Sequence, residues 1–106
     1  MFGVPFIVTH RSGAMETSDD PGAIRSLLAE LDDSDPEHPD VSVSTEEGWT
    51  LSAFASGLVV FENVETGSAP RHKKNLDAKL VLSLMTMLAQ GDLDDLEGQD
   101  WLPGYG

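Results

Sequence analysis

Three short segments of alternating apolar and polar residues constrain this chain most, at residues 41–45, 49–54 and 58–64. A period of two is typical of strands with one buried face. Only residues 46–48 and 55–57 separate the segments, and each of these connections contains a glycine. Strands joined by such short turns must pair antiparallel. The sequence therefore predicts a three-stranded antiparallel meander.

A first helix is expected before this meander. Apolar residues recur from Ile24 to Leu31 with the spacing i, i+3, i+4 and i+7, which is the stripe of an amphipathic helix. Asp20 is a suitable N-cap, and Pro21 is tolerated at the first helical position. The helix is expected to end near residues 32–33.

A longer helix is expected after the meander, from Asn75 as its N-cap to about Gln90, with Gly91 as its C-cap. Its wide apolar face, which includes Leu80, predicts that it lies across the sheet. A short helix follows, capped by Asp92.

One further strand is predicted at residues 4–9, and residues 11–20 and 65–74 are interpreted as loops. The predicted order is β-α-β-β-β-α plus a short C-terminal helix. The length of 106 residues suits a single domain covering residues 1–106. We expect an α+β two-layer sandwich, in which helices cover one face of an antiparallel sheet.

The net charge restricts the partners of this chain. There are 19 acidic and 6 basic side chains, which gives a formal charge of -13. Such a charge opposes binding to nucleic acid or to an anionic membrane, and it attracts basic proteins. No apolar run approaches the roughly 20 residues of a membrane span, and no secretory signal is recognised. A cytoplasmic protein is expected.

The acidic residues are concentrated in blocks. Eight lie between Glu30 and Glu47 with no Lys or Arg among them, and five lie between Asp92 and Asp100. We predict a partner-binding patch in the first block. Its members are Asp32, Asp33, Asp35, Glu37 and Asp40, flanked by Glu46, Glu47 and Trp49. The alternative is that these carboxylates only keep the protein in solution.

No motif for catalysis, cofactor binding or metal binding is found. The histidines are isolated in the sequence, and the glycines do not have the spacing of a phosphate-binding loop. Counted from Asp33, an EF-hand loop would need glycine where His38 stands. The chain is therefore predicted to be no enzyme, without cofactor or metal. An alternative is a ligand pocket between helix and sheet, with Arg71 and His72 at its mouth.

Several segments resemble small bacterial immunity-type proteins encoded beside polymorphic toxins. They are residues 48–52, 56–63, 70–72, 88–93 and 101–105, and the likeness covers roughly residue 31 to the end. The resemblance implies a small, acidic, cytoplasmic protein that binds one cognate toxin tightly and blocks its active site or substrate groove. It implies no particular site residue.

We therefore predict a non-enzymatic inhibitor whose acidic surface occludes a basic toxin. The alternative is an adaptor or assembly module that binds another bacterial protein, as a homodimer through a sheet edge. Whether the chain is a monomer or a homodimer is left open by the sequence.

Overall fold

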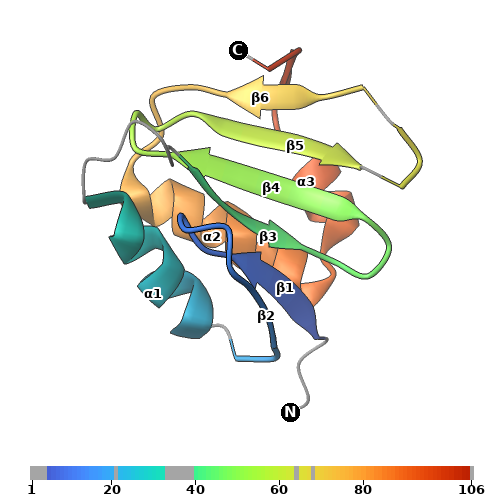
Figure 1. The fold of residues 1–106 in the computed structure, drawn as a ribbon. Helices are drawn as coiled ribbons and strands as arrows, with labels where there is room; N and C mark the ends of the chain where they lie inside the picture. Colours follow the sequence, from blue (N-terminus) through green and yellow to red (C-terminus); the bar gives the residue numbers. More distant parts are fainter. Residues whose placement is uncertain (1–4, 21, 33–39, 64, 68, 106) are drawn as a thin grey trace.

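Seven strands form one antiparallel sheet, and the helices lie on one face of it (Figure 1). The computed structural model describes residues 5–20, 22–32, 40–63, 65–67 and 69–105. The strands are β1 (Phe6–Thr9), β2 (Met15–Ser18), β3 (Asp40–Ser44), β4 (Trp49–Phe54), β5 (Val59–Asn63), β6 (Arg71–Lys73) and β7 (Leu102–Pro103). The helices are α1 (Gly22–Ala29), the 3-10 turn η1 (Glu30–Asp32), α2 (Ala78–Gln90) and α3 (Leu93–Glu97). The strand order is β2-β1-β3-β4-β5-β6-β7. The predicted α+β class is confirmed.

The core lies between the sheet and the helices. Val8 pairs with Val43, Val43 with Leu51, and Leu51 with Phe61, so one row of fully buried side chains crosses four strands. The helices close the core with buried residues at helical spacing: Ile24, Leu27, Val81, Leu84, Met85 and Leu88. This packing explains why the alternation in 41–64 and the stripe in α1 predict the fold correctly.

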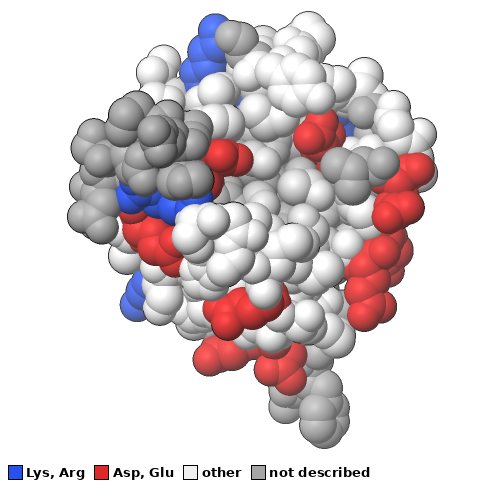
Figure 2. Space-filling view, viewed as in Figure 1, with Lys and Arg blue, Asp and Glu red and all other residues white. Residues whose placement is uncertain are grey.

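No helix formed by the described residues lies on the other face of the sheet. Small hydroxyl residues occupy its centre, and the side chains of Ser44 and Thr50 are hydrogen-bonded at 3.1 Å. In Figure 2, which looks onto this face, the middle is largely neutral and acidic side chains lie toward its rim.

Three strands were not predicted, because their segments have no apolar alternation. Residues 15–18 were expected in a loop, but they form β2, in which three of the four residues are exposed. Residues 71–73 were also expected in a loop, but they form β6, whose sequence is Arg-His-Lys. The two-residue β7 pairs with β6. Pairing with a neighbouring strand, which the local sequence does not encode, makes these segments extended.

The predicted helix ends are only partly correct. The side chain of Asp20 accepts a hydrogen bond from the first backbone N–H of α1 at 2.9 Å, and Gly91 ends α2 in the left-handed conformation. Asn75 is not the N-cap of α2, because its φ is 58° and the helix has not begun. Asp77 caps it instead, accepting from the N–H of Leu80 at 2.9 Å. The Leu80 side chain was expected inside, but it is 52% exposed.

Candidate functional site

Those predicted partner-binding residues that the structure describes lie at two separate places along the sheet. Asp40 begins β3, whereas Glu46 and Glu47 follow its end. Five residues of strand span roughly 17 Å, so these carboxylates lie at opposite ends of the sheet. Asp32 is the last residue of η1. Asp33, Asp35 and Glu37 lie outside the described residues.

Trp49, the predicted aromatic flank of the patch, lies on the helix-covered side of the sheet. Its ring stacks on Phe61 with a centroid distance of 5.2 Å, and the ring of Trp101 packs against the same Phe61 at 5.2 Å. The indole N–H of Trp101 donates to the Leu96 carbonyl at 2.8 Å, which ties the stack to α3. Trp49 is therefore half-buried in an aromatic stack at the border of the core.

The β3–β4 turn approaches the β5–β6 loop, and the two loops together carry three exposed glutamates. We call Glu46, Glu47 and Glu65 the acidic edge. Both loops lie at the right-hand side of Figure 1, and acidic side chains gather along that side in Figure 2. The edge has two carboxylates on one loop and one on the other, so its geometry depends on how the loops are joined.

Asn63, which is only 3% exposed, joins the two loops. Its Oδ1 accepts hydrogen bonds from the backbone N–H of Glu65 at 2.9 Å and of Thr66 at 3.0 Å. Its amide nitrogen donates to the carbonyl of Glu47 at 3.3 Å. One buried amide thus satisfies backbone groups of both loops and fixes the acidic edge.

Gly48 lets the Glu65 side chain lie against the β3–β4 turn. Its φ is 91°, a conformation that favours glycine. A Cβ at this position would lie 2.3 Å from Cγ of Glu65 and 2.9 Å from Oδ1 of Asn63. The close approach of these groups requires glycine, so the turn sequence and the placement of Glu65 depend on each other.

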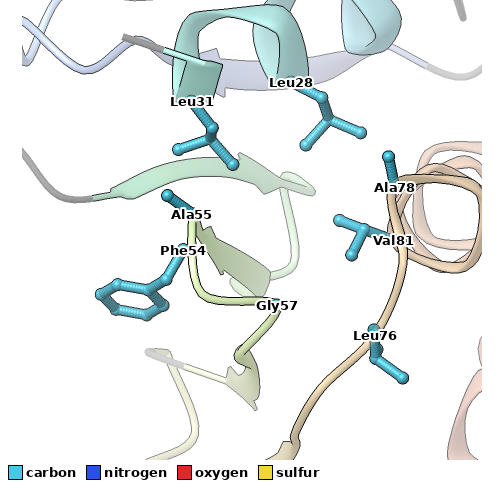
Figure 3. A pocket seen from close by; sticks show the side chains of 8 residues that line it. All are labelled: Leu28, Leu31, Phe54, Ala55, Gly57, Leu76, Ala78 and Val81. Atoms are coloured by element: carbon cyan, nitrogen blue, oxygen red, sulfur yellow. The ribbon is translucent and has the colours of Figure 1, made fainter. Parts of the chain in front are cut away.

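An apolar pocket lies at the other end of the sheet, between α1, the β4–β5 turn and the start of α2 (Figure 3). Its volume is about 130 Å³. The side chains of Leu28, Leu31 and Val81 point toward its centre, whereas the ring of Phe54 turns away. All the described residues that line it are apolar: Leu28, Leu31, Phe54, Ala55, Gly57, Leu76, Ala78 and Val81.

The alternative prediction placed Arg71 and His72 together at the mouth of a pocket, but their side chains lie on opposite faces of the sheet. Neighbouring residues of a strand point to opposite faces. The Arg71 guanidinium lies 4.7 Å from the centre of the Phe61 ring, on the helix side, and pairs with Glu97 at 3.3 Å. His72 is buried on the other face and donates through Nδ1 to the Gly104 carbonyl at 3.0 Å. Neither residue lines the apolar pocket.

A cluster that the sequence did not reveal surrounds His10 in the β1–β2 turn. Nδ1 of His10 lies 2.5 Å from Oε2 of Glu30, and Nε2 lies 2.8 Å from Oε1 of Glu16. The hydrogen bonds that the His10 ring donates to Glu30 and Glu16 raise the pKa of His10 above its ordinary value of 6.5. Arg11 adds a backbone N–H to Oε1 of Glu30 at 3.1 Å and a guanidinium bond to its carbonyl at 2.6 Å.

Within the described part of the chain, no group of three or more His, Asp or Glu side chains is arranged to hold a metal ion. The described residues also include no helix with the length and apolar character needed to cross a membrane.

Comparison with known proteins adds no relative. Scans against protein-family models, curated proteins and solved structures each find no match to this chain. The function is therefore argued from the residues and their arrangement.

Proposed function

We propose that this chain is a non-enzymatic, cytoplasmic inhibitor of the immunity type, which binds a bacterial toxin and occludes its active site or substrate groove. The observation that supports this most directly is the acidic edge, where a buried amide holds the backbone of the two loops that carry three exposed carboxylates. Loops that are already ordered lose little conformational entropy on binding. Carboxylates in fixed positions also speed the encounter with a basic surface.

The expected partner is a protein with Lys and Arg around its functional groove. The formal charge of -13 repels nucleic acid and anionic membranes, so a protein partner fits the surface better than either. The carboxylates then take positions on the toxin that would otherwise hold an acidic or phosphate-bearing substrate. Inhibition is thus steric and electrostatic, and no group of the inhibitor needs to react.

The test uses a toxin that this chain captures from its native host, with association and dissociation rates measured at several salt concentrations. We expect the triple variant Glu46→Gln, Glu47→Gln, Glu65→Gln to slow association roughly tenfold and to weaken its salt dependence, with little change in dissociation. The matched control removes three exposed carboxylates elsewhere, by Asp94→Asn, Asp95→Asn and Asp100→Asn. It should change association much less.

The loop predicted from the sequence provides a second arm of the same test. Neutralising Asp32, Asp33, Asp35, Glu37 and Asp40 removes the charge of that acidic block, of which Asp40 begins β3. If this variant alone slows association, the toxin binds at this block and the acidic edge is not the interface. If neither variant changes association or protection against the toxin, the electrostatic mechanism is wrong.

A further inference from the structure

Neutral His10 has one proton too few to serve both of its carboxylate partners. A neutral imidazole carries a single N–H, and an ionised carboxylate only accepts hydrogen bonds. Both ring nitrogens of His10 nevertheless lie within hydrogen-bond distance of a carboxylate oxygen, at 2.5 Å for Glu30 and 2.8 Å for Glu16. Both contacts are satisfied only when the ring is an imidazolium. Loss of its proton must therefore break one of them.

The two carboxylates are not held equally. The Glu30 side chain is 31% exposed, and it also accepts a hydrogen bond from the backbone N–H of Arg11. The Glu16 side chain is 61% exposed and lies on β2, an edge strand that pairs only with β1. Glu16 gains more hydration on release, and it has less support from the fold. Its contact is the one expected to break.

We propose that His10 is a pH-sensitive clamp on the edge strand β2. The imidazolium holds Glu16 of β2 and Glu30 of η1 together, whereas the neutral ring keeps Glu30 and releases Glu16. Among the described residues, the charged groups that face the ring are Glu16, Glu30 and the neighbouring Arg11. The clamp is independent of the proposed toxin, because it acts within one chain.

The pH range of release follows from the same contacts. Both carboxylates stabilise the charged ring, so the pKa of His10 lies above 6.5 in the folded protein. The clamp is closed below that value and opens as the pH rises through the folded-state pKa. Strand β2 is then held by its ladder with β1 alone.

Nuclear magnetic resonance of the full chain tests the clamp. We expect the His10 ring to titrate above the value of about 6.5 that an exposed histidine shows. The amide protection factors of Glu16 and Ser18, whose N–H groups face β1, should fall severalfold between pH 6 and pH 8.5 after correction for intrinsic exchange. Those of β4 and β5 should stay constant. A His10 midpoint at or below 6.5, or unchanged protection in β2, overturns the proposal.

Substitutions separate the clamp from a general effect of pH. Position 16 is exposed, so the variant Glu16→Gln should fold. It should lower the midpoint of the His10 titration and abolish the pH dependence of amide protection in β2. Glu65→Gln removes an exposed carboxylate at the other end of the sheet and serves as the matched control. If Glu65→Gln lowers the midpoint as much as Glu16→Gln does, the effect is one of net charge, and no local clamp exists.

Discussion

The two ends of the sheet are held by chemically different groups. At the acidic edge, the neutral amide of Asn63 bonds the backbone of both loops. At the opposite end, where Thr9 pairs with Ser42, the titratable ring of His10 bonds two carboxylates. A neutral amide keeps its bonds across the physiological pH range, whereas a histidine makes both of its bonds only while protonated. One end is therefore fixed and the other responds to pH.

The strongest test of this comparison uses three glycines with φ near 90° and different surroundings. A Cβ on Gly57 would lie 2.7 Å from the backbone oxygen of Leu76, which cannot move away, so Gly57→Ala should cost about 3 kcal/mol of unfolding free energy. At Gly48 the nearest neighbour is the Glu65 side chain, which can shift. Gly48→Ala should therefore lower the unfolding free energy by about 2 kcal/mol. Gly13 has open space, which leaves a backbone cost of about 1 kcal/mol.

Urea denaturation of the three variants gives this order directly. A cost for Gly48→Ala that equals or exceeds that for Gly57→Ala would mean that Glu65 cannot move. The acidic edge would then be more rigid than the contacts suggest.

A second test removes the amide that fixes the acidic edge. Asn63→Ala leaves the backbone N–H groups of Glu65 and Thr66 without their buried acceptor, and a loss of about 2 kcal/mol is expected. Gln99→Ala removes the same functional group from a surface site with one bond at 3.3 Å, and its effect should stay within about 0.5 kcal/mol. Equal effects for the two variants in chemical denaturation would show that Asn63 does not fix the edge.

A third test measures how the stability contributed by His10, at the other end of the sheet, depends on pH. The folded-state pKa of His10 is raised, so protonation stabilises the fold. This contribution is complete below the unfolded value of 6.5 and is lost as the pH rises through the folded-state pKa. His10→Gln should therefore cost most at pH 6, by less than about 1 kcal/mol for such partly exposed pairs, and least at pH 9. A cost that grows with pH contradicts the assignment.

The smallest effect is expected beside the acidic edge, where the Tyr105 hydroxyl donates to Glu62 at 2.9 Å. That bond and the nearby charge raise the pKa of Tyr105. Glu62→Gln should lower the midpoint of phenol ionisation, which absorbance detects cleanly because this is the sole tyrosine. Tyr105→Phe should leave the stability almost unchanged, since the pair is exposed. A midpoint unchanged in Glu62→Gln would show that the two side chains do not interact.

The sequence predicts those parts of the fold in which one face is buried along the whole element. The strands β3 to β5 and the stripe of α1 have such faces, so their periods appear in the residue order. Strand β2 is exposed along most of its length, so it has no apolar period. Strand β6 has none either, because its side chain on the helix side at Arg71 is a cation that covers an aromatic ring. Their strand character comes from neighbours that are distant in sequence.

The sequence lists the carboxylates of the candidate site but does not predict the arrangement of those that the structure describes. The carboxylates are visible in the sequence, but their separation by the length of β3 depends on the extended conformation of that strand. The hydrogen bonds that hold the two ends join residues that are far apart in the sequence. Asn63 and Glu47 are separated by 16 positions, and His10 and Glu30 by 20. No local motif marks such pairs. The nearest sequence signal for such a long-range hydrogen bond is a polar residue beside a turn, such as Asn63.

The aromatic stack determines what optical measurements report about this protein. Both tryptophans of the chain flank Phe61, at 5.2 Å each. Intrinsic fluorescence and near-ultraviolet circular dichroism therefore report on one junction, where the sheet meets the segment after α3. Opening of β2 around His10 should leave these signals almost unchanged. An experimenter who follows tryptophan alone would record a rigid molecule while its titratable end opens.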